Sequence, residues 1–515
     1  DNSLSWIWDN IVNYTWKKSV HSITATGVFS AQKYQYDRLY GASKDLSFNS
    51  LWYNLNGGAI ESLSSNFSQW TMMSYVGRIN YGLMDRYLLT ASLRYDGSSR
   101  LSEGNKWALF PSAAIAWRIT EEDFAKNLDW LSNLKLRFSY GQAGNTNSVS
   151  PYASEGTISG SVYYPFGTST SVGNLPANIA NPMLTWERTS EYNVGLDFGF
   201  LNQRISGNIE YYNRTTNDLL MKRNIPVHLG YSSVTSNVGS VRNSGFELQL
   251  NTANIMTKNF AWNTTINLAY NKNEIVSLAD EEDLSNYSIH LQGMRGRYSD
   301  KRFIGKPVDT NWTQNTIGVW QLGEEEEAAK YGCVPGNFKI KDYNNDGKLT
   351  DDDYIIDGKR TPDWTGGMTN MFKIYDFDFS FHMYFQAGAT QYDRFFENFA
   401  LEWNSQNFNN LRTNYWTPEN PSNTMGRPSQ MGSRGNIAYE RTDFLKVSYI
   451  TLGYTLNKRL MSKWGLDNAR IYVTVQNPFI LTKFRGLDPE QPDLTNIGDT
   501  DGMTMNALLG VNISF

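Results

Sequence analysis

One short segment of the chain has the residue types and the spacing of a metal-binding loop. Ca²⁺ takes roughly six to eight oxygen ligands at about 2.4 Å, and a loop of about 12 residues around a sharp glycine turn can supply them. Residues 342–353 read DYNNDGKLTDDD, and the candidate ligands are Asp342, Asn344, Asp346, the carbonyl group of Lys348 and Asp353. The final ligand is Asp where such loops usually have the longer Glu. The spacing therefore predicts a Ca²⁺ site of modest affinity in an EF-hand-like loop.

A simpler structural interpretation of this segment stays open. The sequence Asn-Asp-Gly favours a tight turn, and neighbouring acidic residues favour a solvated loop that binds no ion. A Ca²⁺ ion in this loop would fix a long outer connection in place and would not catalyse a reaction. Calorimetric titration with Ca²⁺ separates the two interpretations.

No other segment has the pattern of a catalytic or cofactor site. The 4 histidines are scattered along the chain and lack the short spacings of a zinc site. The sequence contains neither a phosphate-binding GxxxxGK[ST] motif nor the GxSxG or GxGxxG motifs. We therefore expect a protein that is not an enzyme, has no catalytic residues and binds no cofactor apart from this Ca²⁺.

Composition limits the class of protein further. The chain has 515 residues and a formal net charge of -5, which argues against the basic surface of a nucleic-acid-binding protein. Cys333 is the only cysteine, so an intrachain disulfide is excluded. The mean hydropathy is -0.50, and the sequence has no run of about 18 apolar residues that could form a transmembrane helix. A transmembrane β-barrel remains possible, because its strands are apolar on one face only.

The elements that position the loop are predicted to be strands, because apolar and polar residues alternate along the chain. The segment Tyr87–Tyr95 begins and ends one apolar face with tyrosine and places polar residues on the other face. A strand of that length, tilted by about 40°, spans roughly 20 Å of membrane, close to the apolar band between the aromatic girdles of an outer-membrane barrel. Similar faces are formed by Trp107, Leu109, Ala113, Ile115 and Trp117; by Leu134, Leu136, Phe138 and Tyr140; by Trp262, Thr264, Ile266, Leu268 and Tyr270; and by Phe377, Phe379, Phe381, Met383 and Phe385.

The polar faces of these strands carry charges that are expected to line the interior of a barrel. The candidates are Arg94, Lys135, Arg137, Glu247 and Asp378. We expect most of them to hydrate the wall or to pair with a plug, and contact with cargo is the alternative. The sequence identifies no substrate-binding residue.

The lengths of the connections provide an independent argument for a barrel. Bacterial barrels have short periplasmic turns and long extracellular loops, whereas a soluble sandwich has no reason to alternate in this way. The predicted long connections are 142–185, 221–239, 278–363, 390–442 and 481–503, and the short ones lie near Leu201, at 253–258, near Tyr375 and at 457–466. We count about 15 strands, an odd number, whereas single-chain bacterial barrels close with an even number. At least one earlier strand is therefore expected outside this chain.

Several blocks of sequence closely resemble one family, the SusC/RagA-type TonB-dependent transporters of Bacteroidetes. The blocks follow one another in family order from about residue 70 to the C-terminus. They include RYLLTASLRYDGSSRL, LSNLKLRFSYGQAGN, LTWERTSEYNVGLDFGFLNQRISGNIEYYNRTTNDLL, NVGSVRNSGFELQL and PGNFKIKDYNNDGKLTDDDYIIDGKRTPDWTGG. The last strand, which ends at Phe515, looks like the C-terminal signal that is read by barrel-insertion machinery.

The resemblance implies an all-β fold and an integral place in the bacterial outer membrane, surrounded by lipid. It implies that residues 1–515 are the C-terminal part of an antiparallel barrel of about 22 strands, and that the plug domain and the first strands are absent. The implied partners are a SusD-like lipoprotein lid, the TonB complex acting through the absent N-terminal region, and oligosaccharide or peptide cargo. A dimer of the two-protein unit is a further implied possibility, and no nucleic acid is expected.

Three alternatives for the function stay open on the sequence. One is a stand-alone TonB-dependent receptor for siderophores or vitamins, without a lid. Another is a passive porin or an adhesive barrel. The third is a secreted sandwich-type glycan enzyme, which would need a cleft with paired carboxylates. Anomalous gel migration of the unheated protein would favour a barrel over the enzyme.

Overall fold

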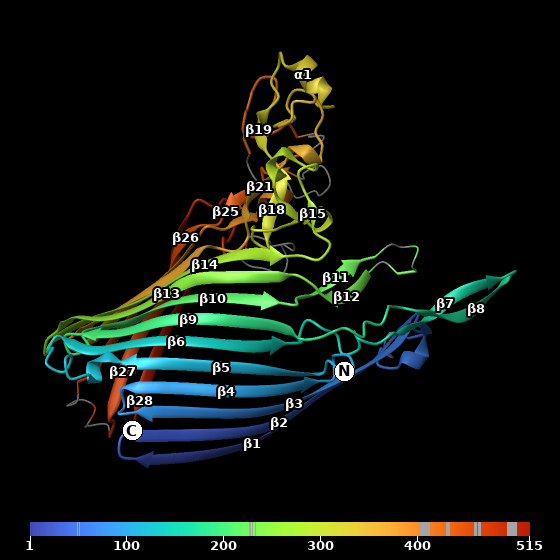
Figure 1. Ribbon diagram of the computed structural model, residues 1–515. Coiled ribbons are helices and arrows are strands. Elements are labelled where there is room, and N and C mark those ends of the chain that lie inside the picture. Colours follow the sequence, from blue (N-terminus) through green and yellow to red (C-terminus); the bar gives the residue numbers. More distant parts are fainter. Residues whose placement is uncertain are drawn as a thin grey trace. The chain divides into compact units, whose positions relative to one another are not determined.

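The structure is a computed structural model that describes residues 1–515 apart from 49, 51, 226–227, 229, 232, 402–412, 429–432, 458–460, 462–464 and 492–501. One antiparallel sheet of 15 strands dominates it, which confirms the predicted fold class and strand count (Figure 1). In sheet order the strands are β1 (Asn2–Lys18), β2 (His21–Lys44), β3 (Ala59–Leu83), β4 (Tyr87–Ser98), β5 (Trp107–Arg118), β6 (Leu131–Asn145), β9 (Glu187–Phe200), β10 (Ile205–Asn217), β13 (Ser240–Met256), β14 (Phe260–Ser277), β22 (Trp364–Ile374), β23 (Phe377–Ala387), β26 (Phe444–Thr455), β27 (Asn468–Thr482) and β28 (Asn506–Ser514).

The smaller elements lie within the connections between these strands. They form short antiparallel ribbons, which satisfy backbone hydrogen bonds inside long segments. The ribbons are β7 (Ile158–Phe166) with β8 (Ser169–Pro176), β11 (Leu220–Asn224) with β12 (Ser233–Asn237), β15 (Glu282–Asp283) with β16 (Arg295–Arg297) and β17 (Arg302–Phe303), β18 (Thr310–Gln314) with β21 (Tyr354–Lys359), β19 (Thr316–Val319) with β20 (Phe338–Ile340), and β24 (Thr390–Tyr392) with β25 (Tyr439–Arg441). Within the described ranges, the short α-helices are α1 (Glu325–Lys330) and α2 (Arg394–Phe396). In the described residues, no helix is long and apolar enough to cross a membrane.

The apolar faces that were predicted from alternation are the exposed faces of β4 and β5. In β14 the predicted apolar side chains are half-buried, and Asn263 and Asn267 on the opposite face are exposed. In β4 the side chains of Tyr87, Leu89 and Leu93 are 45%, 44% and 55% exposed, whereas those between them are mostly half-buried. In β5, Leu109 and Ile115 are exposed in the same way. A soluble sheet would hide such a face, so the pattern fits a surface that lipid covers.

From β6 to β28 the connections alternate between long and short, as the sequence predicted, whereas β5 and β6 are joined through 119–130, a longer segment than the 99–106 that joins β4 and β5. The strands β14 and β22 are joined through 278–363, whereas β22 and β23 are joined through 375–376 only. One short connection differs in its bounds, because β13 continues to Met256 and the turn occupies 257–259 rather than 253–258. Parts of the predicted connections 221–239, 390–442, 457–466 and 481–503 lie outside the described residues.

The short turns rely on left-handed backbone at residues other than glycine. Met84 and Asp85 between β3 and β4 have φ angles of 56° and 55°, and Tyr375 between β22 and β23 has a φ of 53°. Left-handed residues match the twist of a tight hairpin, although they cost a side chain about 1–2 kcal/mol. The pairing of long adjacent strands, which is continuous from Leu83↔Tyr87 through Met72↔Ser98, stabilises this conformation.

The chain forms two compact units, of which the first comprises Asp1–Glu122, Leu136–Val194 and Arg214–Ser240. Its buried core lies beside the end of β4, the start of β5 and the connection between β6 and β9. The core consists of Leu101, Ala108, Phe110, Val149, Leu184 and Trp186. The ring of Trp186 packs edge-on against Phe110, with 5.4 Å between centroids. This core gives the connection between β6 and β9 a fixed anchor.

The second unit comprises Asp123–Lys135, Gly195–Asn213 and Val241–Phe515. Two buried clusters lie in its long connections rather than in the strands of the 15-stranded sheet. One cluster includes Val319, Phe338, Phe396, Leu401, Trp416 and Met425, and the other consists of Leu284, Leu291, Tyr298 and Phe303. In Figure 1 the segment that carries β15 to β21 extends away from the ends of β14 and β22. These connections therefore have cores of their own.

Candidate functional site

The predicted Ca²⁺ loop forms the sharp turn that its sequence requires. Asn345 and Gly347 adopt left-handed conformations, with φ angles of 57° and 79°. The carboxylate of Asp342 accepts hydrogen bonds across the turn from the backbone N–H groups of Asn345, at 2.6 Å, and Gly347, at 2.9 Å. The turn therefore curls around the side chain of Asp342, the first candidate ligand.

The other candidate ligands have hydrogen bonds to the same segment. Asp346 accepts a hydrogen bond from the N–H of Lys348, at 2.8 Å, and Asn344 accepts one from the N–H of Asp346, at 3.1 Å. Asp353 is fully buried, and its two carboxylate oxygens accept from the backbone N–H groups of Tyr343 and Thr350. Asp353 therefore closes the loop from its C-terminal end. Among the described residues, no three His, Cys, Asp or Glu side chains are close enough together to hold a metal ion.

The loop is attached to an earlier part of the same connection, 278–363, through His290. The imidazole of His290 packs edge-on against the ring of Tyr343, with 4.2 Å between centroids. Burial lowers the pKa of His290, the nearby Lys341 lowers it further, and Asp353 opposes the change. Ser288 donates a hydrogen bond to the carbonyl oxygen of Asp352, at 2.9 Å. These contacts join the Ca²⁺ loop to Ser288 and His290, and Leu349 of the loop packs against the cluster that contains Val319 and Phe338. The sequence predicted none of these contacts.

Another acidic residue that sequence reasoning missed is Asp393, at the N-terminus of α2. Its side chain is fully buried, and one carboxylate oxygen accepts a hydrogen bond from the N–H of Phe396, at 2.9 Å. The second oxygen has no hydrogen-bond partner within the described residues. The pKa of Asp393 is raised to about 6, chiefly by burial, while the hydrogen bond from Phe396 opposes the rise and the nearby Glu440 adds to it. The sequence around Asp393 did not predict its burial, because Gly486, which is far away in the sequence, lies against its carboxylate.

Replacement of Asp393 with Asn is expected to stabilise its connection at neutral pH. Because the folded pKa of about 6 exceeds the ordinary value of about 3.9, the folded state favours the protonated carboxyl. The stabilisation that the protonated carboxyl group of Asp393 contributes is complete below about pH 4, declines between about pH 4 and 6, and is lost above that range. Hydrogen exchange of residues 388–401 should slow in the variant at pH 7.5, by the equivalent of about 1–2 kcal/mol, and should match wild type at pH 4.

Asp352, which is half-buried and lies outside residues 388–401, supplies a control for this measurement. Its replacement with Asn should leave exchange in residues 388–401 unchanged at both pH values. Equal exchange in wild type and the Asp393→Asn variant at pH 7.5 would contradict the proposed cost of the buried charge.

Most of the charges predicted on the polar face of the sheet have partners on that face. Arg94 pairs with Asp96 at 2.6 Å, Lys135 with Asp197 at 3.1 Å, and Asp378 with Arg470. Arg137 also has an interaction partner. Glu247 is the exception among the described residues, since its exposed carboxylate has neither a hydrogen bond nor an ion pair. The pairs explain most of these charges as parts of a polar wall.

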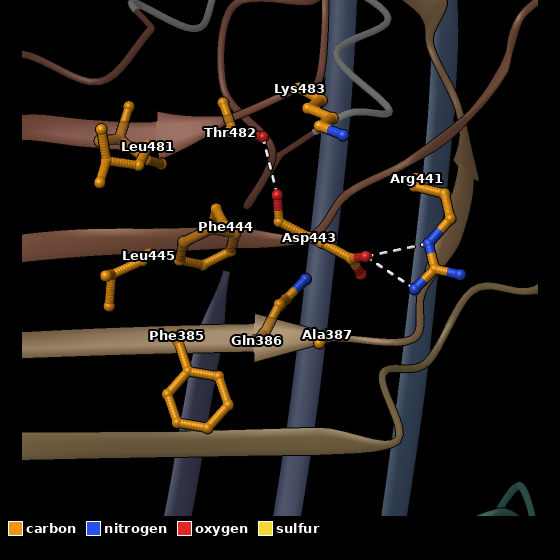
Figure 2. Close-up of a pocket in the computed structure, with 11 residues that line it drawn as sticks. Phe385, Gln386, Ala387, Arg441, Asp443, Phe444, Leu445, Leu481, Thr482 and Lys483 are labelled. Carbon is orange, nitrogen blue, oxygen red and sulfur yellow. Dashed lines mark hydrogen bonds and ion pairs between the residues drawn. The ribbon is translucent and has the colours of Figure 1, made fainter.

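A hollow of ≈ 970 Å³ lies where the apolar face of β23, β26 and β27 meets the connections. Figure 2 shows the side chains that line it. Its apolar lining includes Phe385, Leu445 and Leu481, which are register neighbours on adjacent strands. At its border the guanidinium of Arg441 donates two hydrogen bonds to one carboxylate oxygen of Asp443, at 2.9 and 2.7 Å. Thr482 donates to the carbonyl oxygen of Asp443, at 2.8 Å. Asp443 therefore ties these strands together at the boundary between an apolar and a polar surface.

Comparison with known proteins gives a consistent result. Residues 2–365 match the family model for the TonB dependent receptor-like beta-barrel. The chain is 35% identical to the TonB-dependent receptor SusC of Bacteroides thetaiotaomicron over 457 residues, which cover 86% of this chain and 44% of SusC. It is 32% identical to the TonB-dependent receptor P26 of Formosa agariphila, covering 100% of this chain and 53% of that protein.

Solved structures give the same fold. The RagAB peptide transporter matches with a TM-score of 0.81 at 23% identity, over 100% of this chain and 56% of that one. The RagAB peptide importer in its 'closed-closed' state matches with a TM-score of 0.80 at 24% identity, over 100% of this chain and 56% of that one. The chain spans about half the length of the curated relatives that it matches.

Proposed function

The chain belongs to the family of TonB-dependent receptor-like β-barrels, and from that premise we propose that it takes part in active import of oligosaccharides or oligopeptides across the outer membrane. It is an integral protein of the bacterial outer membrane. The named relatives are receptors and transporters, which fits the expectation that it is not an enzyme. The observation that carries the proposal is a sheet with an exposed apolar face, a polar face and long connections that leave from one end of its strands.

Import of this kind needs energy and a means of capturing cargo. The outer membrane has no ATP, so we propose that the TonB complex drives the cycle through a region that precedes this chain. We further propose that a SusD-like lipoprotein covers the long connections and captures cargo. The similarity to SusC supports the pairing, and the match to RagAB, which is described as a peptide transporter, supports a large organic cargo.

The long connections have a structure suited to docking a lid. Buried clusters within 278–363 and 390–442 hold them, so they do not depend on the main sheet alone. One example is Trp416, which is buried against Phe338 and donates a hydrogen bond from its indole N–H to Gln321, at 2.9 Å. A connection that is already ordered loses less conformational entropy when a partner binds.

Purification of the full-length protein from outer membranes in mild detergent tests the proposal. We expect a lipoprotein in equal amount, identified by mass spectrometry. We also expect uptake of oligosaccharide or peptide to stop when TonB is deleted. A barrel that purifies with a bound iron chelate or vitamin and without a lipoprotein would overturn the lidded version in favour of a stand-alone receptor. Uptake that persists without TonB would indicate a passive porin.

We also propose that the loop 342–353 binds Ca²⁺ as a structural ion. The ligand spacing and the left-handed turn at Asn345 and Gly347 support this, and Ca²⁺ would replace some of the present contacts of the carboxylates with backbone N–H groups. Calorimetric titration of the full-length protein should give a Kd of about 10⁻⁴ to 10⁻³ M. Asp346→Ala should abolish the binding, whereas Asp352→Ala, at a position that is not a predicted ligand, should preserve it. Absence of Ca²⁺ binding by the wild type would leave the solvated turn as the correct interpretation.

A further inference from the structure

Within the second unit, the polar face of five adjacent strands contains a recess with unused hydrogen-bonding groups. The strands are β10, β13, β14, β22 and β23, and the cavity volume is ≈ 420 Å³, within the range of about 300–1,000 Å³ that is typical of small-ligand sites. The polar side chains that we use below are Glu247, Gln249, Asn267, His382 and Tyr384. We propose that this recess is a cargo subsite that binds one or two residues of a neutral oligosaccharide. The inference rests on the proposed import function and names its cargo class.

The recess lies near the end of the sheet from which the long connections leave. Gly367 is three residues from Trp364, where β22 begins after the connection 278–363. Tyr384 is three residues from Ala387, where β23 ends before the next long connection. Three residues of strand correspond to about 10 Å, so cargo that enters from the side of the long connections meets the recess early.

A glycine and a fixed histidine shape one side of the recess. A Cβ atom on Gly367 would lie 3.0 Å from Cε1 of His382, so glycine leaves room for the imidazole ring at this position. The Nδ1 atom of His382 is hydrogen bonded to the hydroxyl of Thr369, at 2.8 Å. The ring also stacks on Tyr449, with 5.7 Å between centroids and 16° between planes. These contacts fix the ring before a ligand binds and leave the Nε2 atom for a ligand.

Four of the other polar groups have no partner within the described part of the chain, whereas Glu210 has one. In the described part of the chain, the side chains of Glu247, Gln249 and Asn267 and the hydroxyl of Tyr384 make no hydrogen bond or ion pair. Together they offer carboxylate and amide oxygens as acceptors, and amide and phenol groups as donors. Each hydroxyl of a sugar both donates and accepts, so a mixed set of this kind fits it. The rings of Tyr384 and His382 offer flat apolar faces to the C–H groups of a sugar.

The charge and the polarity of the recess argue against other cargo. Its charged side chains are Glu210 and Glu247, both acidic, and neither Lys nor Arg lines it, so an anionic ligand would be repelled. Leu248, Leu268 and Ala269 also line the recess, so the preference for a sugar over a peptide rests on its unpaired polar side chains. A neutral sugar is therefore the best match.

Two asparagines on the same strand provide a matched test. Asn267 lines the recess, whereas Asn263 lies on the same face of β14, four residues or about 14 Å further along, and is equally exposed. The full-length protein, purified with the partners that accompany it, is incubated with two pools. One contains neutral oligosaccharides released from starch, xylan, mannan, inulin and laminarin, and the other contains tryptic peptides of casein. Mass spectrometry identifies the molecules that are retained, and titration gives their affinities.

We expect wild type and Asn263→Ala to retain oligosaccharide equally. Asn267→Ala and Glu247→Gln should each bind it about tenfold more weakly, because each loses about one hydrogen bond to the sugar. Gel migration before and after heating verifies that each variant is folded. Equal binding by all four proteins, retention of peptides alone, or retention of neither pool would overturn the inference. The TonB-dependent uptake measurement judges the import function independently, so either proposal can fail while the other survives.

Discussion

Replacement of Ala91 with Lys is expected to reduce sharply the amount of folded protein in the outer membrane, whereas Ser92→Lys should be tolerated. Ala91 lies midway along the exposed apolar face of β4, and its register neighbours on β3 and β5 are Ile79 and Ala113. A lysine there would place an ammonium group in lipid near the middle of the bilayer. That costs about 2–4 kcal/mol on the lipid face of an outer-membrane barrel.

The adjacent residue tests the same strand from its other face. Ser92 forms a hydrogen bond with Ser112, at 2.7 Å, and its register neighbour on β3 is Arg78. Because Arg78 already occupies this face, a second long cation can reach water there. The cost should be about 1–2 kcal/mol, for the lost hydrogen bond and for the repulsion between the new ammonium group and the opposed Arg78.

Heat modifiability of the full-length variants in outer-membrane fractions measures this difference. The Ala91→Lys variant should show little of the compact form that migrates anomalously before heating, and Ser92→Lys should resemble wild type. Equal behaviour of the two variants would mean that the exposed apolar face does not contact lipid, and the membrane orientation of β4 would be wrong.

Replacement of Trp186 with Ala should produce the second large effect, at the anchored connection between β6 and β9. Trp186 is 1% exposed, and its indole N–H donates to the carbonyl oxygen of Lys106, at 2.9 Å. Truncation of a buried tryptophan typically costs about 3–5 kcal/mol because a cavity replaces its contacts. The carbonyl of Lys106 also loses its indole donor.

A conservative variant separates packing from hydrogen bonding. Trp186→Phe keeps most of the apolar contact with Phe110 and Leu184 and loses the indole donor, so it should cost about 1–2 kcal/mol. Hydrogen exchange of residues 146–186 in the full-length protein measures both effects. Much faster exchange is expected for Trp186→Ala than for Trp186→Phe. If the alanine variant exchanges at the wild-type rate, Trp186 does not anchor this connection.

Most of the strands, the face that each residue occupies and the order of short and long connections from β6 onward follow from the amino-acid sequence alone. These are local properties, because side chains on a strand alternate with a period of two whatever the strand contacts. The Tyr87–Tyr95 face and the odd strand count therefore followed from the sequence. The sequence predicted the bounds of the turns less accurately, because Met84 and Tyr375 form tight turns without the glycine that usually occurs there.

The sequence predicted part of the structure of the candidate Ca²⁺ loop. Its spacing predicted a turn at Gly347, and the structure has that turn. Only the tertiary structure decided that Asp353 is buried and that His290 packs on Tyr343, because those contacts depend on the fold of the connections around the loop. The sequence spacing specifies which oxygens are available, whereas packing decides what surrounds them.

The buried Asp393, the core around Trp186 and the recess beside His382 were decided by tertiary structure alone. Each brings together residues that are far apart in the chain, such as Asn267 and Tyr384 in the recess. Strand pairing and register set such neighbours, and a shift of one residue would turn every side chain of a strand to the opposite face. Local sequence patterns therefore predict which face a residue occupies, and the register of the whole sheet decides which residues share a site.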